Sequence, residues 1–109
     1  MRTLKLWPNE SLKTPCLPVD PNSVKDAFVQ TLITDLKHAL IAYQAQGIAA
    51  PQVGENVGII VILSNGVPLA MVNPIWEPVG TEVINSSEGC LSLPGVVINV
   101  PRYQRIIAH

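Results

Sequence analysis

The stretch that organises this sequence reads Ser86-Ser87-Glu88-Gly89-Cys90-Leu91-Ser92-Leu93-Pro94-Gly95. Its composition favours neither a helix nor a regular strand, and it places one thiol between two glycine-containing turns. A cysteine thiolate acts either as a nucleophile or as a soft metal ligand. For a lone cysteine, however, a buried free thiol in a tight turn is the commoner outcome. The stretch therefore needs a second motif before it indicates a function.

That second motif is Gly47-Ile48-Ala49-Ala50-Pro51-Gln52, which ends 38 residues before Cys90. Its small side chains alone predict only a close-packed connecting loop. Together with Glu88-Gly89-Cys90-Leu91-Ser92, it resembles peptide deformylase, the metallo-hydrolase that removes the formyl group from the N-terminal methionine of nascent chains. The resemblance covers nearly the whole chain, since Leu6-Trp7-Pro8-Asn9 and Val100-Pro101-Arg102 also follow the family pattern.

The resemblance implies roles for three residues in catalysis. Cys90 corresponds to the cysteine that, with two histidines, binds a divalent metal; ferrous iron is expected, with zinc, nickel or cobalt as alternatives. Such a metal lowers the pKa of its bound water. The backbone N–H of Leu91 and the side-chain amide of Gln52 correspond to the donors that stabilise the oxygen developing negative charge on the formyl carbon.

The resemblance also implies two supporting pairs. Gly47 and Gly89 correspond to residues whose backbone faces the N-formylmethionyl peptide. Glu88 resembles a glutamate that pairs with an arginine, here Arg102, and holds the cysteine loop rigid. The alternative is that Glu88 and Arg102 are two unrelated surface charges.

Three positions depart from the family pattern. Ala45 replaces the family's first glycine, Gln46 replaces an aliphatic residue, and Ser86 stands where the family often has an aliphatic side chain. Gln46 places a polar group near the expected methionine pocket. These departures leave the substrate preference open.

The family's third motif, His-Glu-x-x-His, supplies two metal ligands and the catalytic acid-base, and the sequence reaches His109 without it. We therefore expect residues 1–109 to be a single, incomplete deformylase-like domain that is inactive alone. One alternative is an enzyme whose metal site is completed by another chain or a continuation, and another is a non-catalytic peptide-binding module. A competitor outside the family is a cysteine hydrolase with Cys90 as nucleophile and His38 or His109 as base.

The composition agrees with one small domain that does not bind nucleic acid. Of the 109 residues, 48% are hydrophobic and 14% are charged, against roughly a quarter charged in an average soluble domain. The net charge of -1 gives no basic face for nucleic acid or a membrane surface. The longest apolar run, Ile59 to Leu63, is far shorter than the ~20 residues of a membrane span.

A cytoplasmic location is therefore expected, with Cys16 and Cys90 as reduced thiols and Cys16 as a small buried hydrophobe. By resemblance, contact with the ribosome is also expected, because the substrates are nascent chains. Two apolar strand faces, at 57–63 and 96–100, are expected to lack the family's histidine-bearing helix as a partner. An oligomer that covers this exposed face is one expected outcome.

The expected fold class is α+β, with one N-terminal helix followed by antiparallel strands, as in a peptide deformylase without its C-terminal metal-binding helix. Residues 1–19 are predicted to form an extended arm that covers an edge. Ser23 is predicted to cap the helix in a capping box with Asp26, and Gly47 to end it. The apolar stripe of the helix comprises Val24, Phe28, Leu32, Leu36, Ala39, Leu40 and Tyr43.

The strands are predicted from short β-rich runs after residue 56. Asn65-Gly66 predicts a tight hairpin turn, because both residues accept positive φ. Trp76 and Pro78 are predicted to close the second strand, with Trp76 serving in packing. The predicted strands are Val57 to Leu63, Leu69 to Asn73, Glu82 to Asn85, Val96 to Val100 and Arg105 to Ala108.

Overall fold

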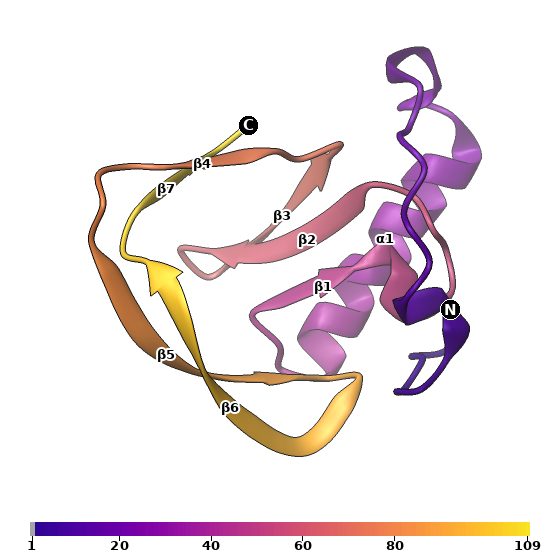
Figure 1. Cartoon of the computed structure of the whole chain (residues 1–109). Helices are drawn as coiled ribbons and strands as arrows, with labels where there is room; N and C mark the ends of the chain where they lie inside the picture. The colour runs from indigo at the N-terminus through magenta and orange to yellow at the C-terminus, as the bar shows by residue number, and fades with distance from the viewer. Residues whose placement is uncertain (1) are drawn as a thin grey trace.

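The computed structural model describes residues 2–109 and has the predicted α+β architecture, with antiparallel strands following a helix (Figure 1). The elements in chain order are η1 (Glu10–Leu12), η2 (Pro21–Ser23), α1 (Ala27–Ala42), β1 (Gly47–Ala49), η3 (Ala50–Val53), β2 (Ile59–Ser64), β3 (Val67–Val72), β4 (Trp76–Pro78), β5 (Val83–Cys90), β6 (Leu93–Tyr103) and β7 (Ile106–Ala108), where η marks a 3-10 helix. The strands form three separate antiparallel sheets, ordered β1-β2-β3, β4-β7 and β5-β6.

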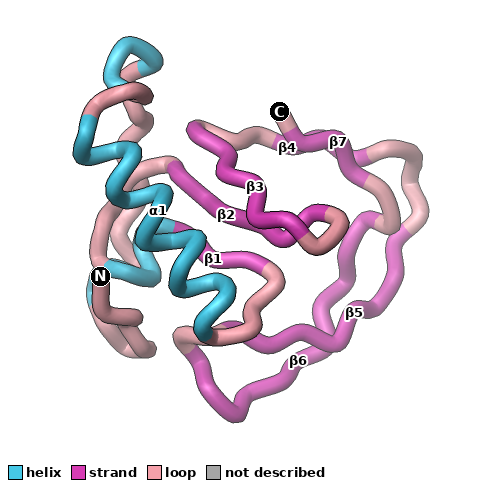
Figure 2. Tube along the Cα trace, turned by 180° about the vertical axis from the view of Figure 1, so that it is seen from behind, coloured by secondary structure: helices cyan, strands magenta, loops and turns pink. Residues whose placement is uncertain are grey.

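The α1 helix lies against the β1-β2-β3 sheet (Figure 2), and the hydrophobic core lies between them, with Ala50 and Val53 of η3 contributing to it. We call α1, η3 and this sheet together the helix block. The largest fully buried side chains are Leu32, Leu36 and Leu40 of the helix with Ile59 and Val61 of β2. Leucines four residues apart share one face of a helix, and residues two apart share one face of a strand. The face of β2 that carries Ile59 and Val61 is thus covered by α1, and for this face the expectation of a missing partner was wrong. Ile60 and Ile62, on the opposite face, are only partly buried.

The turn between β2 and β3 confirms the hairpin prediction. Ser64 pairs with Val67, and both turn residues have positive φ, 49° at Asn65 and 79° at Gly66. These angles suit the two-residue turns whose twist matches that of the flanking strands. The pairing continues from this turn to Ile59 and Val72.

The boundaries of α1 differ from the prediction at both ends. Ser23 lies in η2, and the helix begins after Asp26, whose side chain makes no capping hydrogen bond. At the other end the chain turns at Gln44, where φ is 53°. Gly47, the predicted terminator, is the first residue of β1. None of the helices within residues 2–109 is long and apolar enough to cross a membrane.

The apolar stripe of the helix is also shifted from the predicted one. Phe28 is 49% exposed and Tyr43 51% exposed, whereas Val29 and Ile33 are buried. The buried residues of α1 recur at intervals of three or four along almost its whole length, so the face that meets the sheet is turned toward Val29 and Ile33 and away from Phe28. His38 lies on the exposed side of α1.

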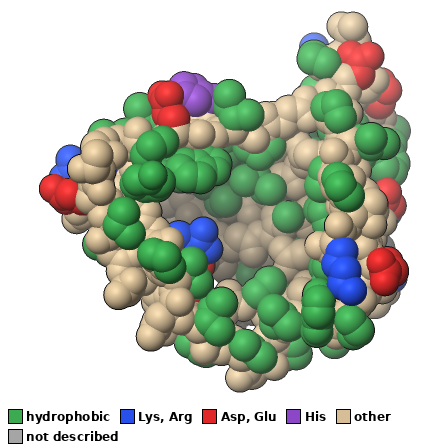
Figure 3. Space-filling view, viewed as in Figure 1, with side chains coloured by type: hydrophobic (Ala, Val, Ile, Leu, Met, Phe, Trp, Pro, Cys, Tyr) green, Lys and Arg blue, Asp and Glu red, His purple; other side chains and the backbone are tan. Residues whose placement is uncertain are grey.

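Residues 83–103 form a long β5–β6 hairpin, called the hairpin below, whose strands pair with each other and with no other strand of residues 2–109. Contrary to prediction, Ser86 to Cys90 lie in strand β5, whose register shifts between Gly89 and Cys90, and the chain turns only at Leu91-Ser92. Side chains on β6, Val96 to Ile98, are exposed, as expected. Figure 3 shows hydrophobic side chains gathered around a hollow on one face of the molecule.

Trp76 does not close β3 but begins β4, which pairs with β7. Its ring packs against that of Tyr103, with ring centroids 6.1 Å apart and planes tilted by 54°. Such a tilted pair is a favourable aromatic arrangement. The packing role predicted for Trp76 is therefore present, although the side chain is largely exposed.

Residues 2–19, called the arm below, run along the helix block rather than forming a strand of a sheet. Leu17 makes an isolated parallel bridge with Val57. The Asn73 side chain accepts a hydrogen bond from the Val19 N–H at 2.8 Å and donates one to the Val19 carbonyl at 2.7 Å. Cys16 and Cys90 are both free thiols, as predicted, but Cys16 is exposed rather than buried.

Candidate functional site

The two sequence motifs meet in space at a thiol and an amide. The Gln52 Nε2 lies 3.7 Å from the Cys90 Sγ and 3.2 Å from the Ser92 Oγ, both at hydrogen-bonding distance. The Gln52 Oε1 accepts a hydrogen bond of 3.0 Å from the Ala49 N–H. Because its oxygen is held by the backbone, the amide presents its N–H groups to Cys90 and Ser92.

Local sequence explains how Gln52 reaches this position. Pro51 lies in the first turn of η3, where a fixed φ and a missing N–H are tolerated. Gly54 follows η3 with φ of 89°, a conformation that glycine adopts without strain. The short helical turn between β1 and this glycine directs the Gln52 side chain toward the hairpin.

A groove of about 800 Å³ separates β1 from β5. One wall is formed by Ala45, Gln46, Gly47 and Gln52, and the other by Ser86 to Leu91 with Pro94 to Val97. Among the described strands, β1 pairs only with β2 and β5 only with β6, so each keeps one unpaired edge. Unpaired edges offer backbone donors and acceptors to an extended chain.

Glu88 and Arg102 form a two-pronged ion pair across the hairpin. The Arg102 Nε donates to the Glu88 Oε2 at 2.8 Å, and the Arg102 Nη2 donates to the Oε1 at 2.6 Å. These hydrogen bonds hold the pKa of the Glu88 carboxyl below its usual value and raise the pKa of Arg102. Glu88 is therefore an ionised cross-strand support two residues from Cys90, and not a proton donor at neutral pH.

The turn of the hairpin attaches to the core. The Leu91 side chain packs against the hydrophobic cluster of the helix block, and Ser92 is only 3% exposed. Sequence reasoning did not assign a role to Ser92, whose hydroxyl lies beside the Gln52 amide. The signal that could have indicated a role for Ser92 is its position as the last residue of the Glu-Gly-Cys-x-Ser motif.

Of the metal ligands expected from the resemblance, the described residues contain one, Cys90. Within residues 2–109, no group of three His, Cys, Asp or Glu side chains is arranged to hold a metal ion. Cys90 is exposed at the groove and offers a single thiolate donor, whereas a zinc enzyme of this kind uses three protein ligands. The described residues therefore do not fit a complete metal centre.

The two histidines proposed as bases for a cysteine hydrolase do not line the groove. His109 lies at β7, with its Nε2 3.4 Å from the Glu77 carboxylate, and His38 is on the exposed side of α1. A catalytic base must reach its nucleophile within hydrogen-bonding distance. The structure thus gives Cys90 an amide neighbour but no histidine partner among the described residues.

The fold and this site define an α+β protein in which a thiol and an amide from two distant motifs meet at a strand-edged groove. Comparison with known proteins identifies the family to which this chain belongs. The sequence matches the family pattern of polypeptide deformylase over residues 1–109, and the chain belongs to that family.

Individual relatives agree with this assignment. The peptide deformylase of Dictyoglomus turgidum is 38% identical over 95 residues, which cover 85% of this chain and 61% of the relative. That of Aquifex aeolicus is 33% identical, covering 97% of this chain and 64% of the relative. The chain thus spans about three fifths of the length of these curated relatives.

Solved structures share the fold. The peptide deformylase of Thermotoga maritima superposes with a TM-score of 0.88 at 28% identity, covering 99% of this chain and 71% of that chain. An Acinetobacter baumannii peptide deformylase solved with Met-Ala-Ser bound has the same fold, with a TM-score of 0.89 at 24% identity, covering 98% and 74%.

Proposed function

We propose that this chain carries the peptide groove and the carbonyl-polarising part of a deformylase, an enzyme that hydrolyses the formamide bond of N-formylmethionyl peptides. The observation that carries this proposal is the 3.7 Å approach of the Gln52 amide to the Cys90 thiol at the groove. The oxygen of a bound formyl group placed there would meet donors already oriented toward it. Preorganised donors of this kind lower a hydrolytic barrier because they need no reorganisation during the reaction.

Two donors would stabilise the developing oxyanion. The Gln52 Nε2 is held in place through its oxygen by Ala49. Leu91 lines the same groove, and its backbone N–H makes no hydrogen bond within residues 2–109. Loss of one such donor typically raises the barrier by about 2.7–4 kcal/mol.

The peptide itself would bind as an added strand between the free edges of β1 and β5. Gly47 and Gly89 both line the groove and are exposed, so a ligand can reach their backbone groups. Strand addition gives affinity through main-chain hydrogen bonds and specificity through side-chain pockets. The bound Met-Ala-Ser in the Acinetobacter baumannii enzyme is consistent with a short peptide in this fold.

Cys90 is the donor in this chain that the family resemblance assigns to a divalent metal, expected to be ferrous iron. Such a metal supplies an activated water when bound. Because the described residues offer one ligand, the metal-dependent step of the whole protein is a prediction. A cytoplasmic location and contact with the ribosome also stay predictions.

A second candidate is a peptide-binding module without hydrolysis. The specific observation in its favour is that the groove and both donors are formed, while residues 2–109 contain no three-ligand cluster. Binding and hydrolysis make different demands, because binding needs only the strand edges and the polar donors.

Titration of chain 1–109 with formyl-Met-Ala-Ser and with unformylated Met-Ala-Ser, with and without stoichiometric iron, separates these candidates. We expect saturable binding that prefers the formylated peptide, and Gln52→Ala to weaken that preference about fivefold, the factor of one ordinary hydrogen bond. Gln104→Ala, which removes an amide outside the groove, is the matched control.

Release of formate in that experiment would support the enzyme, and binding without release would support the module. If the chain does not distinguish the two peptides, or if Gln104→Ala has the same effect as Gln52→Ala, the proposed use of the groove is wrong. A Leu91→Pro variant, which removes the second donor, should lose the preference in the same way.

A further inference from the structure

The hairpin is attached to the rest of the chain mainly at its turn. Among residues 2–109, three hydrogen bonds join residues 83–103 to the arm and the helix block, and all three end at Cys90 or Ser92. Two come from the Gln52 side chain, and the third comes from the backbone of the arm. The geometry of the Gln52–Cys90 pair therefore depends on how this turn is held.

The arm holds both halves of the site through its backbone. The Lys5 N–H donates to the Gln52 carbonyl at 2.6 Å, and the Trp7 N–H donates to the Ser92 carbonyl at 2.8 Å. Lys5 and Trp7 are alternate residues, so a short segment of three residues bridges two motifs that lie 40 residues apart, at Gln52 and Ser92. The intervening Leu6 N–H has no hydrogen-bond partner in the described part of the chain.

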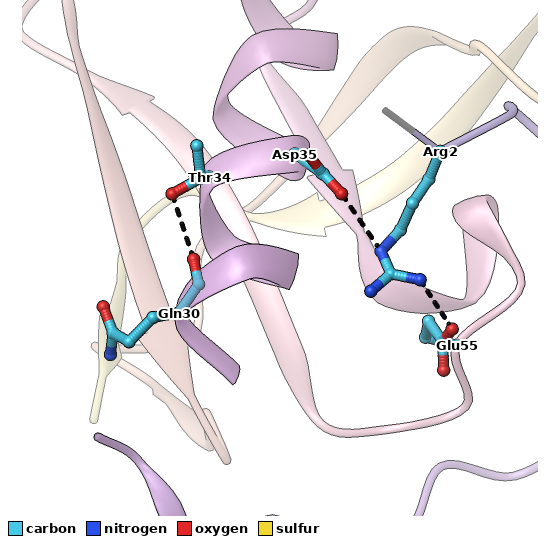
Figure 4. Close-up of polar contacts among 5 residues, drawn as sticks. All are labelled: Arg2, Gln30, Thr34, Asp35 and Glu55. Atoms are coloured by element: carbon cyan, nitrogen blue, oxygen red, sulfur yellow. Dashed lines mark hydrogen bonds and ion pairs between the residues drawn. The ribbon is translucent and has the colours of Figure 1, made fainter. Parts of the chain in front are cut away.

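Both ends of this bridge are fastened to the helix block. On one side, Arg2 lies between two acidic residues, with its Nη1 2.8 Å from the Glu55 carboxylate and its Nε 3.3 Å from that of Asp35 on α1 (Figure 4). On the other side, the Ser11 hydroxyl donates to the Pro51 carbonyl at 2.9 Å. The segment between Arg2 and Ser11 is thus tied at one end to α1 and Glu55 and at the other end to η3 itself.

We propose that the backbone of Lys5 to Trp7 positions the site, because it fixes η3 and the hairpin turn at the separation that places the Gln52 amide beside Cys90 and Ser92. These are positioning residues that touch neither substrate nor reacting atoms. Their importance for catalysis rests on the proposed function. Their effect on the Gln52–Cys90 geometry does not, and it can be measured without activity.

The test replaces single backbone N–H groups by ester oxygens at residue 5, 6 or 7 of chain 1–109. Each ester removes one N–H and keeps the side chain. The readout is the side-chain amide resonance of ¹⁵N-labelled Gln52 and its rate of exchange with water. We expect esters at residues 5 and 7 to shift this resonance and to speed its exchange about fivefold, and the ester at residue 6 to leave both unchanged.

The β2–β3 amide resonances report in the same spectra that the helix block is intact. A Gln52 resonance that does not move with the esters at residues 5 and 7 would overturn the proposal. An equal shift with the ester at residue 6 would also overturn it, because the effect would then not depend on the two hydrogen bonds.

Proline variants give a genetically encoded version of the experiment. Lys5→Pro and Trp7→Pro remove the bridging N–H groups, and Leu6→Pro is the matched control. The rate of alkylation of Cys90 relative to Cys16 is the second readout, since both thiols are exposed. A rise in that ratio confined to the first two variants supports the proposal, and equal ratios in all three contradict it; where a proline variant does not fold, the ester series decides.

Discussion

The helix block and the hairpin bury their side chains to very different extents, although both are built on regular strand pairing. The block encloses five large side chains with less than 2% exposure, from α1 and β2. Within residues 83–103, Ser92 is the one buried side chain. Pairing alone therefore does not make a core, because a two-stranded ribbon needs a packed face to be stable by itself. The block supplies the stability, and the hairpin supplies most of the groove.

The largest expected effect comes from opening a cavity in the block. Leu36→Ala removes a fully buried side chain of α1, and we expect it to lower the free energy of unfolding by about 2–5 kcal/mol. Ile41→Ala on the same helix is the control, because Ile41 is 63% exposed and should cost less than about 0.5 kcal/mol. Urea unfolding measures both, and similar losses would show that the core does not lie under α1.

The next largest effect is expected at Asn73, which directly follows β3, the last strand of the block. Asn73→Ala removes both hydrogen bonds to the Val19 backbone, leaving a partly buried donor and acceptor without partners. We expect a loss of about 2 kcal/mol in the free energy of unfolding, within the range for unsatisfied buried polar groups. Asn73→Asp, which keeps the acceptor, should lose less. An Asp variant as unstable as the Ala variant would contradict this account.

A matched pair of glycine substitutions tests whether the two regions unfold together. Gly66 in the block and Gly95 in the hairpin both have φ of 79° with open space at the missing Cβ, so alanine strains each backbone by about 1–2 kcal/mol. We expect Gly66→Ala to lower the midpoint of global unfolding. Gly95→Ala should instead speed hydrogen exchange in the hairpin, because that region can open locally. Equal shifts of the global midpoint would show one cooperative unit.

The smallest effect is electrostatic and confined to the hairpin. Arg102 lowers the pKa of Glu88, so the pair stabilises the hairpin above the unfolded pKa of glutamate, and this contribution is lost as the pH falls through the lower folded pKa. We expect Arg102→Gln to raise the midpoint of the Glu88 carboxyl titration, followed by ¹³C NMR. An unchanged midpoint would mean that the two-pronged pair does not persist in solution.

The difference in packing between the helix block and the hairpin also explains which parts of the fold could be predicted from the sequence. The block was predictable where side chains pack, since the run of β-branched residues from Ile59 to Ile62 and the Asn65-Gly66 turn leave clear patterns. The three-residue strands β1 and β4 are too short to show a period. In β5, Ser86, Ser87 and Gly89 do not alternate with apolar residues, because no sheet face there is packed.

Only those parts of the site that depend on particular side chains could be predicted from the sequence. The proximity of Gln52 and Cys90, and the Glu88–Arg102 pair, followed from motifs whose residue types matter. The bridge through Lys5 and Trp7 uses backbone N–H groups that every residue except proline carries, so no residue type signals it. The turn at Gln44 was missed for a related reason, since glutamine rarely adopts a positive φ.

The register of the hairpin changes abruptly beside the thiol. Gly89 pairs with Val97, but the next residue, Cys90, pairs with Leu93. Pro94 to Val96 therefore form a bulge in β6 that has no pairing partners on β5. Such an irregularity separates the ladder that carries Glu88 from the turn that carries Ser92. Inserting or deleting residues in this bulge would change the size of the groove wall, while the β5–β6 ladder and the turn keep their alignment. The bulge is therefore a suitable place to engineer the groove for longer or shorter ligands.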